Sequence, residues 1–290
     1  MSMKILIFGD GFIARNLHLF LNKENFSVIL ISRKTIVGSS HFDFFDLNKV
    51  QSVIQEYRPD IVINTIWNTE LKSYAHSSLN LDYALTTVKL AEICIQNRVK
   101  HFISFGSSAE YGESPGACDA EQTVCKPESI YAQSKFDTYL RISGLYKSTQ
   151  LRFTWVRVFQ PYGFYQDVSR FIPHVIECFR TGRELVLEDA NSQLDWIASI
   201  DISRGIEFII ENDTPEVLDI GTSVPLYNSE VVNVIARKVG APTRQHQVSD
   251  VATQSRIRFV SNSSFLIRNW TPQFNLEQGI EWLVSNVQKN

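Results

Sequence analysis

Residues 4–14 read Lys4-Ile-Leu-Ile-Phe-Gly9-Asp-Gly11-Phe-Ile-Ala14, an apolar run followed by two glycines and a helical pattern. Strand, tight glycine turn and helix in this order are the context in which a helix N-terminus binds the pyrophosphate of a dinucleotide. Gly9 suits the turn, Gly11 lets the backbone approach the phosphates, and the later alanine lets the helix pack closely on the strand. The stretch therefore predicts a parallel sheet that binds a dinucleotide, with Phe12 and Ile13 also contacting it.

Composition excludes several classes of protein. The chain has 290 residues, of which 44% are hydrophobic, and a formal net charge of −3 at pH 7. Charges of both signs are interspersed, so we expect no nucleic-acid partner. No run approaches the roughly 20 apolar residues that span a bilayer, and the N-terminal apolar run is too short for a signal peptide. Four cysteines without a Cys-x-x-Cys pair predict free thiols and no metal site. We expect a cytoplasmic protein with no membrane partner.

Strand and helix patterns alternate along the chain. This alternation predicts an α/β protein with a Rossmann-type doubly wound parallel sheet and a smaller C-terminal α/β substrate lobe. We expect the cofactor-binding domain to comprise residues 1–160 and about 195–221, and the substrate lobe to comprise about 161–194 and 222–290. The strands expected in the sheet cover residues 4–8, 27–32, 41–45, 60–66, 99–106, 151–158 and 217–221. The expected helices include 15–23, 79–95 and 129–146, with Ser129 as the N-cap of the last.

A tyrosine and a lysine stand four positions apart in the stretch Tyr131-Ala-Gln-Ser-Lys135. Residues four apart share a helix face, and an ammonium beside a phenol favours the phenolate, so Tyr131 is a candidate general acid or base. On its own this spacing is also explained by an exposed helical pair. Ser107 adds context because it follows the apolar run 99–106. Ligands bind at the carboxyl ends of the strands in an open parallel sheet.

The second expected strand ends in Ser32-Arg33-Lys34, about 20 residues after the glycine turn. An NAD enzyme of this fold places an acidic residue there, on the ribose 2′-hydroxyl. Serine followed by two basic residues would instead bind and neutralise a 2′-phosphate. The stretch favours NADP(H) over NAD as the cofactor, and the alternative interpretation is a solvated basic turn.

Together these motifs resemble the extended short-chain dehydrogenase/reductases that act on nucleotide sugars, the NAD-dependent epimerase/dehydratase family, over nearly the whole chain. Members carry a Ser or Thr four residues before the Tyr of a Tyr-Gly pair, and here the residue in that position before Tyr111 is Ser107. The resemblance implies hydride transfer between a nicotinamide cofactor and a carbonyl carbon. Ser107 would hydrogen-bond the carbonyl oxygen and Tyr131 would transfer the proton. Lys135 would lower the pKa of Tyr131 and bind the nicotinamide ribose.

The resemblance also implies further contacts. The cofactor contacts fall at the adenine (Asp46 and Leu47, with Asp43 as a nearby competitor) and farther along the cofactor (Thr65, Ile66 and Phe159). The glycine loop is one residue shorter than is usual in the family. In family members, the helices that match residues 79–96 and 129–146 pair with their copies in a second subunit, which implies a homodimer.

Missing residues narrow the reaction. Family 4,6-dehydratases carry an Asp-Glu pair directly after the Ser/Thr, and here those positions hold Ser108 and Ala109. The bifunctional epimerase-reductase that makes GDP-fucose uses a Cys and a His, and the matching positions here hold Ala109 and Arg170. What remains is simple ketone reduction, or 4-epimerisation by oxidation and re-reduction of the same carbon.

The family's diphosphate-binding arginine is replaced by Leu194. Other arginines could supply the charge, because a guanidinium binds phosphate from several directions; each could also be ordinary surface charge. The expected substrate contacts are Ser108, Gln160 in place of a family Asn, Arg170, Arg256 and Arg258. If no arginine serves, the substrate is not a nucleotide sugar.

The sequence therefore predicts an NADPH-dependent reductase that converts a nucleotide-linked 4-keto-6-deoxyhexose to the 4-hydroxy sugar, for bacterial surface-polysaccharide synthesis. The alternative enzyme is a nucleotide-sugar 4-epimerase with tightly bound NAD. A non-catalytic, cofactor-sensing protein on the same fold is the alternative from another class.

Overall fold

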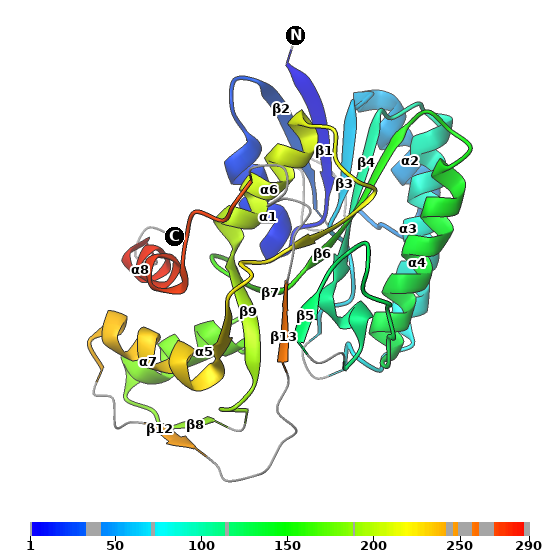
Figure 1. Ribbon diagram of the computed structural model, residues 1–290. Helices are drawn as coiled ribbons and strands as arrows, with labels where there is room; N and C mark the ends of the chain where they lie inside the picture. The colour runs from blue at the N-terminus through cyan, green and yellow to red at the C-terminus, as the bar shows by residue number, and fades with distance from the viewer. Residues whose placement is uncertain are drawn as a thin grey trace.

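A six-stranded parallel sheet in the order β10-β6-β4-β3-β1-β2 forms the centre of the molecule (Figure 1). The computed structural model describes residues 2–32, 42–70, 73–113, 116–187, 189–241, 246–248, 257–260 and 270–286. The sheet strands are β1 (Met3–Phe8), β2 (Phe26–Ile31), β3 (Ile61–Asn64), β4 (His101–Ser107), β6 (Arg152–Val158) and β10 (Val217–Ile220). Every neighbouring pair is parallel. The strand order reverses beside β1, so the carboxyl ends of β1 and β3 flank the crevice where such sheets bind ligands.

Helices cover both faces of this sheet (Figure 1). On one face lie α1 (Phe12–Leu21) and α6 (Ser199–Glu211), and on the other lie α2 (Leu47–Tyr57), α3 (Leu79–Gln96) and α4 (Ile130–Tyr146). Side chains alternate along a strand, so Ile5 and Ile7 face the first helix layer while Leu6 and Phe8 face the second. All four are buried, as expected for a strand that is covered on both faces. The predicted doubly wound α/β fold is confirmed.

A second group of elements surrounds its own apolar core. Its sheets contain β5 (Gly116–Cys118), β7 (Gln160–Tyr162), β8 (Leu185–Leu187), β9 (Gln193–Ala198), β11 (Pro225–Tyr227), β12 (His246–Val248) and β13 (Ile257–Val260). Its helices are α5 (Phe171–Thr181), α7 (Asn228–Val239) and α8 (Leu276–Asn286). β5 comes from the first half of the chain yet pairs with β13. The domain boundaries at residues 160 and 221 stay a prediction.

The segment before α2 differs from its prediction. The strand expected over residues 41–45 is absent from residues 42–45, the part of that segment that the structure describes. Asp46 is instead the N-cap of α2, and its side chain accepts a hydrogen bond from the backbone N–H of Lys49 at 3.3 Å. Phe44 is buried with its ring centroid 6.1 Å from that of Phe8, so its apolar side chain packs beside the sheet.

Two other features bear on the predictions from sequence. Ser129 caps α4 as predicted, because its side chain accepts a hydrogen bond from the backbone N–H of Ala132 at 3.1 Å. None of the helices in the described residues is long and apolar enough to cross a membrane.

Close packing of α8 on β7 generates a prediction about stability. A Cβ at Gly279 would overlap the hydroxyl oxygen of Tyr162 and lie 2.9 Å from its Cζ, and Tyr162 is buried. We expect Gly279→Ala to lower the free energy of unfolding by about 1–3 kcal/mol, measured by urea denaturation. Gly144→Ala is the matched control, because a Cβ at this exposed position of α4 meets nothing within 4 Å. That variant should gain up to about 1 kcal/mol. Equal effects at both sites would contradict the prediction.

Candidate active site

A cavity of about 1540 Å³ opens along the carboxyl edge of the sheet. It is lined by the glycine turn after β1, by the ends of β3, β4 and β6, by the start of α4 and by the second lobe. The predicted site residues that line it are Gly9, Gly11, Phe12, Ile13, Thr65, Ile66, Ser107, Ser108, Tyr131, Phe159, Gln160, Arg170 and Arg258. Ser32, Asp46, Leu47 and Lys135 are not among its lining residues. Arg33, Lys34 and Arg256 lie outside the described residues.

The glycine turn has the shape that a dinucleotide needs. Gly9 has φ +129°, and a Cβ there would overlap the hydroxyl oxygen of Thr65, so glycine is required at the turn. Gly11 is the N-cap of α1, and a Cβ on it would meet nothing within 4 Å. The backbone at the start of α1 therefore faces open space beside the cavity. These residues fit a pyrophosphate at the N-terminus of α1.

Near the end of β2, the structure brings in an acid that the linear pattern does not reveal. Ser32 Oγ donates a hydrogen bond to Asp10 Oδ2 at 3.0 Å, and Asp10 lines the cavity from within the glycine turn. The carboxylate of Asp10 therefore lies beside Ser32, which occupies the position where an NAD enzyme of this fold places an acid. Asp10 comes 22 residues before Ser32, so only the parallel pairing of β1 and β2 brings the two together.

The predicted adenine contact receives no support from the position of Asp46. Its side chain caps α2 and lies 3.7 Å from the Nζ atom of Lys49. Asp43, its competitor in the sequence, lines the cavity, as do Phe44 and Phe45. The structure thus places the acid three residues earlier in the chain at the cavity wall.

Ser107 and Tyr131 meet in the cavity. Ser107 is the last residue of β4 and Tyr131 lies in the first turn of α4. Both line the cavity, and the Ser107 side chain lies close enough to the phenol to affect its pKa. The Tyr131 ring packs edge-on against Tyr74, with centroids 5.0 Å apart, and against Trp67 at 6.4 Å. Burial raises the pKa of Tyr131 and outweighs the hydrogen bond from Ser107, which lowers it. The phenol therefore remains protonated at neutral pH.

Lys135 lies one helical turn farther along α4 and is not among the residues that line the cavity. Its Nζ atom donates to the backbone oxygen of Phe105 at 2.5 Å and lies 3.9 Å from the centre of the Trp67 ring. It is 6.0 Å from the centre of the Tyr131 ring. Burial lowers the pKa of Lys135 to about 7, against the opposing effect of Glu110. The prediction that Lys135 depresses the pKa of Tyr131 is therefore wrong in this structure, because burial dominates both groups.

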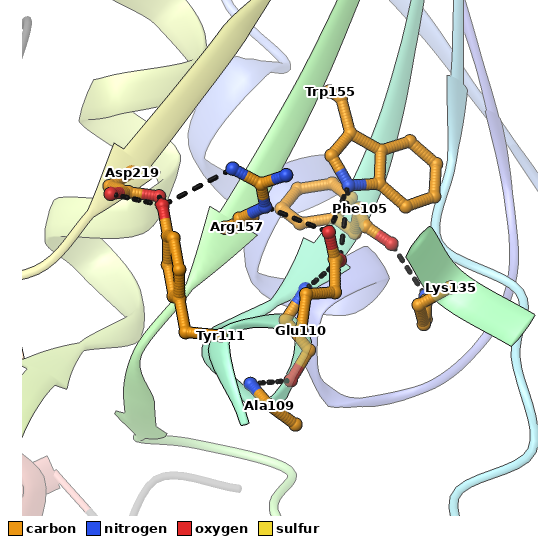
Figure 2. Close-up of polar contacts among 9 residues, drawn as sticks. Phe105, Ala109, Glu110, Tyr111, Lys135, Trp155, Arg157 and Asp219 are labelled. Atoms are coloured by element: carbon orange, nitrogen blue, oxygen red, sulfur yellow. Dashed lines mark hydrogen bonds and ion pairs between the residues drawn. The ribbon is translucent and has the colours of Figure 1, made fainter. Parts of the chain in front are cut away.

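A buried polar network (Figure 2) accepts a hydrogen bond from the backbone N–H of Ser107 through Glu110. It starts in the 3₁₀ helix η1 (Ser108–Tyr111), where Glu110 is fully buried and forms an ion pair with Arg157 Nε at 2.7 Å. Arg157 also donates to the hydroxyl of Tyr111 at 3.2 Å, and that hydroxyl donates to Asp219 at 2.7 Å. The sequence motifs contain Tyr111 and Arg157 but give no signal that Glu110 and Asp219 join them.

The positive charge missing at Leu194 reappears on the neighbouring strand. Arg258 of β13 pairs directly with Leu194 of β9. Its side chain lines the cavity and donates to the backbone oxygen of Gly112. Arg170 also lines the cavity, but its guanidinium donates to the backbone oxygen of Thr69 at 2.7 Å. Among the described arginines that line the cavity, Arg258 is thus the one whose strand position pairs with Leu194.

The doubly wound sheet, the glycine turn and the Ser107–Tyr131 pair define a dinucleotide-binding protein of the extended short-chain dehydrogenase/reductase type. The family model "NAD dependent epimerase/dehydratase family" matches residues 5–221. The chain belongs to this family, so it is an enzyme of a nicotinamide-binding family, as the motifs predict.

Comparisons with individual proteins agree. The low-salt glycan biosynthesis protein Agl12 of Haloferax volcanii is 24% identical over 299 residues, which is 96% of each chain. The dTDP-glucose 4,6-dehydratase of Bacillus anthracis, solved with NAD, superposes with a TM-score of 0.85 at 23% identity, covering 100% of this chain and 97% of that one. The UDP-glucose 4-epimerase of Thermus thermophilus, also solved with NAD, gives 0.86 at 20% identity and 99% of both chains. At these identities the structural likeness shows the fold.

The buried carboxyl of Asp219 generates a prediction about pH. Burial raises its pKa from 3.8 to about 7, although the hydrogen bond from Tyr111 and the charge of Arg157 lower it. A raised folded-state pKa gives stability that is present below about pH 4 and is lost as the pH rises through about 7. We expect the difference in free energy of unfolding, wild type minus Asp219→Asn, to fall by roughly 1–3 kcal/mol across this window, measured by urea denaturation. Asp137→Asn, on the exposed face of α4, should show no such slope. A flat difference for Asp219→Asn would contradict the assignment.

Proposed function

We propose that this enzyme reduces the 4-keto group of a nucleotide-linked 4-keto-6-deoxyhexose to a hydroxyl. The observation that carries the proposal is that Ser107 and a protonated Tyr131 line one cavity together with the glycine turn. Ser108 and Ala109 occupy the positions where a dehydratase needs an acid and a base. Reduction requires a proton donor and no further acid–base pair, which matches the residues present.

In the proposed mechanism, the nicotinamide supplies the hydride. Ser107 donates a hydrogen bond to the carbonyl oxygen, and Tyr131 gives its proton to that oxygen as negative charge develops. A phenol whose pKa is raised by burial keeps its proton until the alkoxide forms. Lys135, held at the end of β4, is proposed to contact the nicotinamide ribose.

The proposed substrate carries a nucleoside diphosphate because Arg258 provides a guanidinium beside Leu194. A guanidinium binds phosphate oxygens in pairs through its fork of N–H donors. Gln160 and Ser108, which also line the cavity, are proposed to contact the sugar or its phosphates. A role in glycan synthesis is supported by the similarity to the glycan biosynthesis protein of Haloferax volcanii, and we propose a cytoplasmic location in a surface-polysaccharide pathway.

The cofactor prediction rests on opposing features. Arg33 and Lys34 favour NADPH in the sequence, whereas Asp10 beside Ser32 favours NAD(H), because a carboxylate repels a 2′-phosphate. The Asp10 contact is also the observation that favours the second candidate function, a nucleotide-sugar 4-epimerase with retained NAD. Two of the similar solved structures, a dehydratase and an epimerase, contain NAD.

We also propose a homodimer formed through α3 and α4, which pack against each other in the subunit. Leu81 and Leu85, four apart on α3, are 60% and 55% exposed, and Leu140 on α4 is 50% exposed. Large apolar side chains exposed on adjacent helices are typical of a surface that another subunit covers.

Tyr131→Phe tests the proposed reaction. Phenylalanine keeps the ring contacts with Tyr74 and Trp67 but lacks the proton, so turnover should fall by roughly 10²–10⁴-fold while cofactor affinity is unchanged. The assay follows NADPH or NADH consumption with 4-keto-6-deoxyhexoses linked to CDP, dTDP, GDP or UDP. Tyr139→Phe, on the same helix, is the control and should retain turnover. Interconversion of 4-hydroxy epimers without net cofactor consumption would favour the epimerase. Undiminished turnover in Tyr131→Phe would overturn the mechanism.

Asp10→Asn tests the cofactor assignment. Removing the carboxylate beside Ser32 should improve NADPH affinity relative to NADH affinity by about tenfold, because it removes repulsion of the 2′-phosphate. Calorimetric titration of both cofactors against wild type and variant measures the ratio. Asp43→Asn, which also removes an acid from the cavity wall, is the control. An unchanged ratio in Asp10→Asn would show that Asp10 does not face the 2′-position.

A further inference from the structure

Glu110 is a fully buried carboxylate that the proposed reaction does not use. Its oxygens accept from the backbone N–H of Ser107 at 2.8 Å, from Trp155 Nε1 at 3.1 Å and from Arg157 Nε at 2.7 Å. Gly106 has no room for a side chain, because a Cβ there would overlap the Trp155 indole nitrogen. The carboxylate is therefore fixed in place on several sides.

The same end of β4 holds Lys135. The backbone oxygen of Phe105, two residues before Ser107, accepts from Lys135 Nζ. The Trp155 indole links the two charges, since its N–H bonds Glu110 and its ring centre lies 5.8 Å from Nζ. Figure 2 shows Glu110 and Lys135 directed toward the end of this strand from η1 and α4. A carboxylate and an ammonium thus share one dehydrated region, where charges interact more strongly than in water.

We propose that Glu110 is a positioning residue of this site: its buried carboxylate supplies the negative charge that keeps Lys135 in its ammonium form at the end of β4. Among the described residues, Glu110 of η1 acts on the charge of Lys135, the Tyr131 ring centre lies 6.0 Å from Nζ on the same helix, and Arg157 of β6 pairs with Glu110. Trp67, in the segment after β3, contributes the neutral face of its ring to the surroundings of Lys135. Glu110 is therefore the acid in this surrounding, and its effect raises the pKa of Lys135 against burial.

The inference rests on the proposed function only for the role of Lys135, which is to contact the nicotinamide ribose. The charge of Lys135 can be measured directly. In protein labelled with ¹³C at lysine Cε, NMR titration follows the protonation of Lys135, assigned by loss of its signal in Lys135→Met. This measurement needs neither cofactor nor sugar. We expect titration near pH 7 in the wild type and a shift of about one pH unit or more to lower pH in Glu110→Gln.

Glu110→Gln keeps an oxygen that can accept from Ser107 but leaves Arg157 buried without its ion pair, which costs stability. If it does not fold, Glu110→Gln/Arg157→Gln removes both charges and avoids an unpaired arginine. Its Lys135 titration should shift in the same direction by a smaller amount, because loss of the Arg157 cation offsets part of the effect. Asp219→Asn is the matched control, because it removes the other acid of the network, which contacts Tyr111 instead of Ser107. Its Lys135 titration should match the wild type. An unshifted Lys135 titration in folded Glu110→Gln, or in the double variant, would overturn the proposal.

A second readout connects the charge to binding. The dissociation constant of NADH or NADPH, measured by cofactor fluorescence between about pH 6 and 9, should rise about tenfold at pH 7–8 in Glu110→Gln relative to wild type. A shifted NMR titration with unchanged cofactor affinity would confirm the charge effect and reject the proposed ribose contact of Lys135. If Glu110→Gln lowers stability but changes neither the Lys135 titration nor the pH dependence of the cofactor dissociation constant, Glu110 has a structural role only.

Discussion

The ion pair between Glu110 and Arg157 is the interaction on which the rest of the site depends. Burying two charges costs several kcal/mol for each ion unless they are paired and fully hydrogen bonded. Both requirements are met here. Glu110 is paired with Arg157 and accepts hydrogen bonds from Trp155 and Ser107, and Arg157 also donates to Tyr111. Tyr111 extends the network to Asp219 on β10. The network thereby ties the ends of β4, β6 and β10 together next to Ser107, which lines the cavity.

Residues of both lobes line the same cavity. The parallel sheet brings the glycine turn and Ser107 to the same edge because all six strands run in the same direction. The second lobe reaches that edge through β9 and β13, which carry Leu194 and Arg258 at the same register. An arginine that is missing from one strand can thus be replaced by an arginine at the paired position of the neighbouring strand. Specificity for a phosphate depends on the position of the guanidinium in space, and the sheet fixes this position from either strand.

Local patterns predicted those parts of the molecule that local physics determines. The apolar run, glycine turn and helix at residues 4–14 form as expected, Ser129 caps α4, and Ser107 meets Tyr131. The contacts that sequence could not reveal join distant residues. Glu110 and Arg157 are 47 positions apart, and Tyr111 and Asp219 are 108 apart. Asp10 reaches Ser32 only because β1 and β2 lie side by side. The predicted strand is absent from residues 42–45 for a related reason, since Phe44 packs beside the sheet instead of joining it.

Burial also reverses an expectation drawn from the spacing of Tyr131 and Lys135. Along an isolated helix, the ammonium would favour the phenolate, but in a dehydrated site each group is pushed toward its neutral form. Glu110 then acts on both in the same sense, because its negative charge raises the pKa of Tyr131 and that of Lys135. A protonated phenol is the form that can give a proton to a developing alkoxide. Oxidation of an alcohol would instead need the phenolate, which both burial and Glu110 disfavour. In the proposed reduction, Tyr131 becomes a phenolate when it gives up its proton and must take up another before the next turnover, whereas a 4-epimerase would take the proton up and return it within one turnover. The protonated phenol that burial and Glu110 favour is the form from which the proposed reduction starts.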